Sequence, residues 1–216
     1  MPIKSEEINT DNAFENCKLG RKKYADVLTS LIGNYPEGFV LAINNKWGTG
    51  KTTFLRMWKE DLKQNEFQTI YFNAWENDFE NNPLIALMGE LKTMKGKNEA
   101  QFTSTLKKAA KLSQHLVPTL VKAVAEKYIS TETVKQAIED VSKGFMDIFE
   151  NEVKEYSERK KSIKEFRDSL SKLIADTTKG KPLVFIVDEL DRCRPNYAVL
   201  ILEQIKHFFS VPNIVF

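Results

Sequence analysis

One stretch, residues 39–53, constrains the fold of this chain more than any other. It opens with an apolar run at residues 39–43, which predicts a buried strand, and continues as a loop that contains Gly48 and Gly50. Apolar residues at helical spacing follow the loop and predict a helix that extends to about Asn65. A strand, a glycine loop, and a helix that opens on Gly-Lys-Thr are the arrangement of a phosphate-binding loop.

The chemistry of phosphate binding accounts for each part of this loop. Glycines let backbone N–H groups turn toward a phosphate without Cβ clashes, and the N-terminus of the helix adds unpaired N–H groups and partial positive charge. We expect Lys51 to reach the outer phosphates of a nucleotide and the Thr52 hydroxyl to ligate Mg²⁺. The residues of the loop predicted to bind the nucleotide are Gly48, Thr49, Gly50, Lys51, Thr52 and Thr53.

Asn45 departs from the full phosphate-loop pattern, which has a glycine five residues before Gly50. Asparagine tolerates left-handed backbone angles, so we expect the loop still to form. The alternative is a chance Gly-Thr-Gly-Lys sequence in a surface turn. The predicted strand before the loop and the predicted helix after it favour the phosphate loop over that alternative.

Composition and charge argue against several other classes of protein. A net charge of +2 at pH 7 gives no argument for a nucleic-acid partner. Two cysteines and two histidines are too few for a disulfide framework or a zinc site, which favours a reducing compartment. The N-terminus lacks the apolar core of a signal peptide and no apolar run is long enough to cross a bilayer, so we expect a cytoplasmic protein without a membrane span.

A second strand is predicted at residues 69–72, where β-branched and aromatic residues follow one another. Its carboxyl end is followed by Asn73, Trp75, Glu76 and Asp78. In open α/β sheets the ligand lies at the carboxyl ends of the strands, which favours a position for these side chains at the nucleotide pocket. Alternatively, Trp75 simply packs and Asn73 caps a turn.

Residues 83–180 are predicted to form an all-helical insertion between the two parts of an α/β core, residues 1–82 and residues 181–216. Within it, apolar spacing predicts separate helices at about residues 134–156 and 163–174. The 4-3 spacing in the first of these is typical of a coiled-coil partner or, more often, of packing within the chain. The insertion is the predicted surface for a protein partner or for self-association.

A third apolar run, residues 183–187, predicts a strand buried on both faces, as a parallel sheet requires. Asp188 and Glu189 follow it directly. We expect Asp188 to hold Mg²⁺ together with Thr52, and Glu189 to act as general base beside Lys51, the second predicted catalytic residue. An Asp-Glu pair after a strand can also cap a helix, but a Gly-Lys-Thr loop in the same chain favours the catalytic interpretation.

With both motifs considered, the sequence resembles the KAP family of P-loop NTPases, in the class that carries an additional catalytic glutamate. The resemblance rests on residues 46–53, 71–75, 185–195 and 202–207, and Trp47 before the loop glycine is specific to that family. It implies a three-layer α/β/α fold with a parallel sheet, ATP and Mg²⁺ as cofactors, and ATP hydrolysis that drives a conformational switch. Trp47 thereby joins the predicted ATP-binding residues.

The family resemblance also carries expectations about the end of the chain and about biology. In this class the strand after the Asp-Glu strand lies between it and the phosphate-loop strand. Here that strand begins at Asn213 and stops at Phe216, so a C-terminally truncated core is expected. Bacterial relatives look like parts of systems that exclude or abort phage infection. A nucleotide-gated interaction module with negligible hydrolysis is the alternative function, and a small-molecule kinase is a third.

Arg192 leaves two interpretations open. It compensates phosphate charge, within the chain or on a neighbouring subunit, or it forms a structural pair with Asp191 that steadies the turn. Cys193 is predicted to be a structural thiol. The basic run at residues 21–23 is predicted to be the solvated start of a helix.

Overall fold

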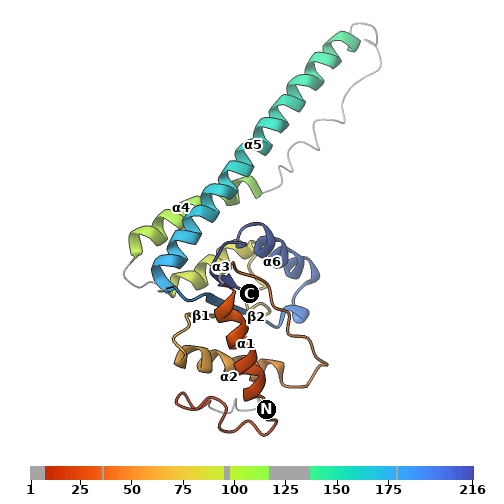
Figure 1. The fold of residues 1–216 in the computed structure, drawn as a ribbon. Coiled ribbons are helices and arrows are strands. Elements are labelled where there is room, and N and C mark those ends of the chain that lie inside the picture. Colours follow the sequence, from red (N-terminus) through yellow and green to blue (C-terminus); the bar gives the residue numbers. More distant parts are fainter. Residues whose placement is uncertain (1–7, 36, 95–97, 117–136, 179) are drawn as a thin grey trace.

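Figure 1 shows the chain in a computed structural model, which describes residues 8–35, 37–94, 98–116, 137–178 and 180–216. Within them the structure forms a parallel sheet with strand order β1-β2-β3. The strands are β1 (Thr69–Asn73), β2 (Leu183–Asp188) and β3 (Ile214–Val215). The helices are α1 (Lys22–Asn34), α2 (Lys51–Gln64), α3 (Pro83–Lys92), α4 (Glu99–Leu116), α5 (Ala137–Thr178) and α6 (Pro195–His207). The short 3₁₀ helix η2 (Leu190–Arg192) connects β2 to α6.

Side chains of β2 alternate between two hydrophobic cores, one on each face of the sheet. Leu183 and Phe185 pack with α3, α4, α5 and α6, whereas Val184 and Ile186 pack with α1 and α2. Helices therefore cover both faces, as the continuous apolar run of this strand predicts for a parallel sheet. The fold is α/β, in agreement with the sequence analysis.

The phosphate-loop strand predicted at residues 39–43 is much shorter than expected. It contributes a single parallel bridge, from Phe39 to Val215, and the Leu41 N–H donates to the Phe216 carbonyl at 2.6 Å. Val40 is 63% exposed, so the run is not buried on both faces. The reason is the short β3, which pairs with this segment only near Phe39 and leaves residues 42–43 without a ladder.

The position of β3 agrees with the family resemblance. Leu183 and Val184 of β2 pair with Ile214 and Val215 on one side of β3, and Phe39 pairs with Val215 on the other. The strand after the Asp-Glu strand thus lies between it and the segment that leads into the glycine loop.

Two helices predicted at residues 134–156 and 163–174 are one continuous helix, α5. The apolar spacing lapses because residues 150–161 are all exposed and have no core to contact. These residues are mostly Glu, Lys and Arg, which favour helix, and no Gly or Pro interrupts them. The helix therefore continues through a stretch that lacks an apolar face.

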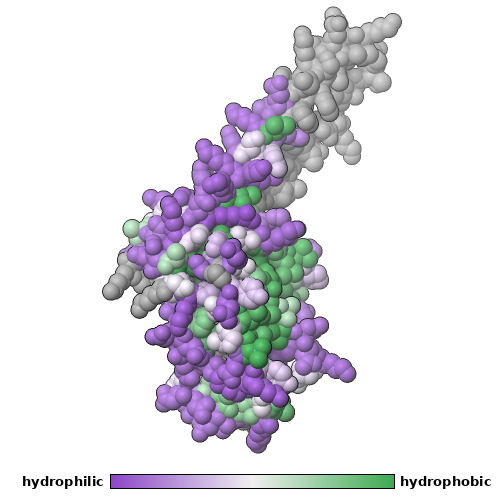
Figure 2. Space-filling model, in the orientation of Figure 1, coloured by the Kyte–Doolittle hydropathy of each residue, from purple (hydrophilic) through white to green (hydrophobic). Residues whose placement is uncertain are grey.

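Helices α4 and α5 pack along each other and extend away from the body formed by the other elements (Figure 1). In that pairing the Thr105 and Ser169 hydroxyls, both fully buried, share a hydrogen bond of 2.9 Å. Figure 2 shows a largely hydrophilic surface along the coloured part of α5 and a hydrophobic area on the body. Helix α6 exposes Val199 and Leu202. The assignment of residues 83–180 to an insertion stays a prediction, and residues 117–136 of that range lie outside the described part.

No helix in the described part of the chain combines the length and apolar character that crossing a bilayer demands.

Gly38 makes a close approach that only glycine permits, which yields a stability prediction. Its φ is +77°, and a Cβ there would lie 2.6 Å from the Ile214 carbonyl oxygen and 2.7 Å from that of Val211. We expect Gly38→Ala to lower the free energy of unfolding by about 3 kcal/mol or more, from backbone strain and overlap.

Gly89→Ala is the matched control for Gly38→Ala, because Gly89 lies within α3 and a Cβ there meets nothing within 4 Å. That substitution should be neutral or stabilising by up to about 1 kcal/mol. Chemical denaturation of both variants measures the difference, and equal stabilities would contradict the packing of Gly38 against the residues that precede and form β3.

Candidate functional site

The carboxyl ends of β1 and β2 are level with each other, and the candidate site lies there. Asn73 pairs in register with Asp188, and the Ala74 N–H donates to the Asp188 carbonyl at 2.9 Å. The glycine loop joins from the other side of the sheet, where Gly50 takes a left-handed φ of 80° and α2 begins at Lys51. Two motifs far apart in the sequence are thereby brought to one edge of the sheet.

The glycine loop folds around the side chain of its own lysine. The Lys51 ammonium donates to the carbonyls of Asn45 at 3.0 Å and of Lys46 at 3.4 Å. Gly48 and Gly50 supply the left-handed angles of the loop, with φ of 76° and 80°. The left-handed tolerance expected of Asn45 is not used, because Asn45 has no positive φ and its side chain instead accepts from the Lys46 N–H at 2.8 Å.

The remaining residues of the loop have different environments. Trp47 is 77% exposed at the tip of the loop. The Thr49 hydroxyl donates to the Lys46 carbonyl at 2.8 Å and so closes the loop on itself. Thr53 lies in the first turn of α2 and is exposed. A role for these three side chains in ATP binding stays a prediction.

Arg21 is a residue of the loop's surroundings that the sequence analysis missed. Its guanidinium donates to the Thr49 carbonyl at 2.6 Å and to the Gly50 carbonyl at 3.1 Å, so the predicted solvated helix start is wrong for this residue. Binding these carbonyls holds them away from the inner side of the loop, where N–H groups bind phosphate. No local sequence pattern signals this contact, because it joins residues 28 and 29 positions apart.

Lys22, the next residue of the basic run, is also held by the body of the protein. Its ammonium lies 3.1 Å from an oxygen of Asp61, whose side chain is only 5% exposed. Partial burial alone would lower the pKa of Lys22, but the hydrogen bonds with Asp26 and Asp61 outweigh it and raise that pKa. This pair fixes α1 against α2. Arg21, which directly precedes α1, reaches the loop from there.

Glu189, the predicted general base, connects the loop to the end of β2. One carboxylate oxygen accepts from the Thr52 hydroxyl at 3.2 Å, and the other lies 2.9 Å from the Arg192 Nε. Glu189 has a left-handed φ of 59°, a strained angle for a residue with a side chain. Thr52 and Glu189 are therefore in direct contact.

Asp188, the predicted metal ligand, is 8% exposed and is held by its neighbours. One carboxylate oxygen accepts from the Tyr71 hydroxyl at 2.7 Å, and the other accepts from the Glu189 N–H at 2.9 Å. Burial and then the hydrogen bond with Asp188 raise the pKa of the Tyr71 phenol. Tyr71 is a second site residue that the site assignment from sequence did not include.

Oxygen donors of the kind that Mg²⁺ prefers are present at this edge of the sheet. The Thr52 hydroxyl donates to the Glu189 carboxylate, and the Asp188 carboxylate accepts from the Glu189 N–H. Among the described residues no group of three or more His, Cys, Asp or Glu side chains forms a metal site by itself. Mg²⁺ usually takes one or two protein ligands and completes its shell with water and phosphate, so these two residues fit the ion.

Arg192 pairs with Glu189, so the predicted pair with Asp191 is wrong. Its guanidinium centre also lies 5.7 Å from the ring centre of Trp47 and 5.3 Å from that of Trp75. The turn geometry decides the partner, because η2 places Arg192 three residues after Glu189 and over its carboxylate.

The other polar residues after β1 hold the surrounding turns. Asn73 accepts from the Glu76 N–H at 3.2 Å, which is the turn-capping alternative. Asp78 accepts from the Arg194 N–H at 3.1 Å and pairs with its guanidinium. Burial, together with Asp78, raises the pKa of Cys193 to about 11, which agrees with a structural thiol.

A cavity of about 370 Å³ opens beside these groups. Residues 40–45 line one side, residues 184–188 of β2 line another, and Lys51, Asp188 and Glu189 belong to its polar lining. Apolar side chains of α2 and α6 also contribute to the lining. The predicted catalytic residues and one predicted metal ligand therefore share a single cavity.

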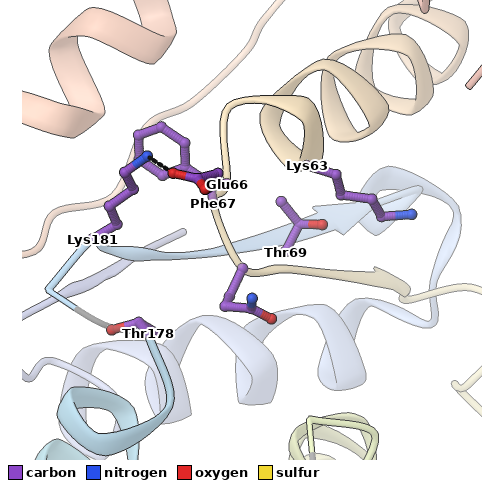
Figure 3. A pocket seen from close by; sticks show the side chains of 7 residues that line it. Lys63, Glu66, Phe67, Thr69, Thr178 and Lys181 are labelled. Carbon is purple, nitrogen blue, oxygen red and sulfur yellow. Dashed lines mark hydrogen bonds and ion pairs between the residues drawn. The ribbon is translucent and has the colours of Figure 1, made fainter. Parts of the chain in front are cut away.

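A second cavity lies at the opposite, amino ends of β1 and β2 and contains none of these residues. Figure 3 shows Lys181 reaching across it to Glu66, with Thr69 on β1 and Thr178 at the end of α5. The Lys181 ammonium is 3.3 Å from a Glu66 carboxylate oxygen and 2.7 Å from the Asn65 carbonyl. Its lysines are engaged with local acceptors, and we assign no ligand to it.

A glycine loop that opens a helix, next to an acidic strand end, defines a P-loop nucleotide-binding domain. The chain belongs to the KAP family: a sequence model of the KAP family P-loop domain matches residues 21–216. An uncharacterized protein of Methanocaldococcus jannaschii is 30% identical over 173 residues, which are 69% of this chain and 88% of that protein. Family membership indicates nucleotide binding and nucleoside-triphosphate hydrolysis.

The two hydrogen bonds from Arg21 lead to a prediction about nucleotide affinity. Arg21→Ala should weaken ADP binding roughly tenfold, because the loop loses charge-assisted bonds that hold its carbonyls in place. Isothermal titration with ADP measures this change. Lys23→Ala is the control, since Lys23 belongs to the same basic run but its ammonium lies over the Tyr24 ring. Equal affinities of the two variants would contradict a role for Arg21 in the loop.

Proposed function

We propose that this chain is a Mg²⁺-dependent ATPase that acts as a conformational switch. The observation that carries the proposal is the direct contact between Thr52 of the glycine loop and Glu189 at the end of β2. This contact joins the candidate base to the first turn of the phosphate-binding helix, and Glu189, Lys51 and Asp188 line the same cavity.

Binding begins with an exchange of partners at the loop. The Lys51 ammonium now donates to two loop carbonyls, and a nucleotide phosphate is a stronger acceptor that would replace them. The N–H groups of the loop and of the first turn of α2 then bind the remaining phosphate oxygens. Arg21 holds the Thr49 and Gly50 carbonyls away from the phosphates throughout.

Hydrolysis transfers the terminal phosphoryl group to water. A bond forms between the water oxygen and the terminal phosphorus, while the bond from that phosphorus to the bridging oxygen breaks. The electron pair of the broken bond leaves with ADP, and the proton of the water goes to the Glu189 carboxylate. Lys51 neutralises charge on the phosphates during this step. Bound Mg²⁺, held by Thr52 and Asp188, supplies charge neutralisation of the phosphate oxygens.

A nucleotide-gated interaction module with negligible hydrolysis is the second candidate. Both carboxylate oxygens of Glu189 are already engaged, by Thr52 and by Arg192. If these contacts persist with nucleotide bound, the attacking water competes with Thr52 and Arg192 for Glu189, turnover is low, and the helices between β1 and β2 would act as a surface gated by binding alone. In either case we propose residues 83–180 as the surface for a protein partner or for self-association; the phage-defence role stays an expectation from the family resemblance.

Two substitutions separate the candidates. Glu189→Gln should lower turnover of Mg²⁺-ATP by roughly 10²- to 10⁴-fold, because the amide does not accept the water proton, while ATP binding is kept. Lys51→Ala should weaken ATP binding and abolish turnover. Phosphate release over a range of protein concentrations, with nucleotide binding measured in parallel, tests both.

The control for these substitutions is Lys63→Ala, which removes an exposed lysine that pairs with Glu60 far from the loop. It should leave turnover unchanged. Turnover that is low in the native chain and unaffected by Glu189→Gln would favour the gated module instead of the ATPase.

A further inference from the structure

Both oxygens of the Glu189 carboxylate have partners within the chain. The Thr52 hydroxyl donates to one, and the Arg192 Nε lies 2.9 Å from the other in an ion pair. The Glu189 side chain is 20% exposed and that of Arg192 41% exposed, so the ion pair is partly shielded from water. Each contact occupies one acceptor position of a carboxylate oxygen, so a water molecule at this carboxylate competes with two existing partners.

Two tryptophans hold the Arg192 guanidinium in place. Trp47 comes from the glycine loop and Trp75 from the turn after β1, and both rings lie within cation–π distance of Arg192. Their side chains are otherwise mostly open to solvent, at 77% and 51% exposed. We expect these two exposed rings to keep the Arg192 guanidinium beside the site when it no longer pairs with the Glu189 carboxylate.

We propose that Arg192 is a positioning residue that exchanges its acceptor, from Glu189 to the terminal phosphate of a bound nucleoside triphosphate, and thereby frees Glu189. The inference rests on the proposed function, because it assigns a role at the same site. A single carboxylate separates the Arg192 guanidinium from the Thr52 hydroxyl, so a phosphate beside Thr52 lies within reach of the same side chain.

The exchange has a physical reason and a consequence for selectivity. A guanidinium binds phosphate oxygens through several parallel N–H donors. The ion pair of Arg192 with the Glu189 carboxylate is formed by Nε. A nucleoside diphosphate lacks the terminal phosphate and leaves Arg192 on Glu189. The arginine therefore distinguishes a triphosphate from a diphosphate, and Trp47 links this choice to the conformation of the glycine loop.

Nucleotide affinities of the full chain test the proposal without requiring turnover. Dissociation constants are measured with Mg²⁺ for a non-hydrolysable ATP analogue and for ADP. Arg192→Ala should weaken binding of the analogue roughly 10- to 100-fold and change ADP affinity by less than about threefold. Glu189→Gln should have the opposite effect and strengthen binding of the analogue relative to ADP, because Arg192 loses its competing partner.

Arg194→Ala is the matched control. It removes the same charge two residues away, from an arginine that pairs with Asp78 instead of Glu189. It should leave the preference for the analogue over ADP unchanged. Arg192→Lys, which keeps the charge but loses the fork of donors, should lose part of the preference and serves where Arg192→Ala does not fold.

Intrinsic fluorescence gives a second readout of the same exchange. Trp58 is 2% exposed and hydrogen-bonded to Thr29 but lines the same cavity, so the response is measured in a Trp58→Phe background, where it comes from Trp47 and Trp75. The analogue should change the emission of this background and ADP should change it less. In Arg192→Ala the two nucleotides should give equal responses.

Two results would overturn the inference: Arg192→Ala weakening analogue and ADP equally, or weakening neither. Failure of the proposed function is a separate result. A native chain that releases no phosphate but loses its preference for the analogue in Arg192→Ala upholds the inference and refutes the ATPase. A native chain that hydrolyses ATP and keeps the preference in Arg192→Ala refutes the inference and leaves the ATPase standing.

Discussion

Strand β2 is the element on which the rest of this structure depends, because it is buried on both faces and ends in charge. Leu183 and Phe185 belong to one core, and Val184 and Ile186 to the other. A slip of one residue would exchange the two faces, so the register of this strand is strongly specified. The same register fixes Asp188 beside the end of β1. The position of Asp188 in the site is therefore determined by the apolar packing of β2, not by contacts within the site.

The polar groups at that strand end form hydrogen bonds with partners within the chain. Lys51 donates to loop carbonyls, Thr52 to Glu189, and Tyr71 to Asp188. Partly buried charges without partners cost free energy, and these internal contacts avoid that cost. Binding of a nucleotide therefore exchanges one set of hydrogen bonds for another. The triphosphate selectivity that we propose would arise from the difference between the two sets at Arg192 of η2.

Sequence patterns predicted the elements whose side chains carry their own periodicity. The bounds of helix α2 and strand β2 were predicted closely. Because Asp188 ends β2 and Lys51 begins α2, the sequence also predicted that these two residues lie at one site. The segment at residues 39–43 was predicted too long, because a strand extends only as far as its neighbour pairs with it. Arg21 was missed for a related reason: its carbonyl partners come from a loop that no local spacing connects to it. Tertiary partners, not propensity, decide such contacts.

A chain of contacts leads from this site to the helices that extend from the body. Arg192 lies against Trp75, and three residues further on Asp78 is held by Arg194. Asn82 then caps α3 and donates to the Ser113 hydroxyl of α4 at 3.4 Å. A series of contacts does not by itself couple two sites. Coupling requires an element that has two arrangements, and both sites must shift the balance between them. In our proposal the arginine with two competing acceptors is such an element, and the turn between β1 and α3 would connect its choice of acceptor to α4.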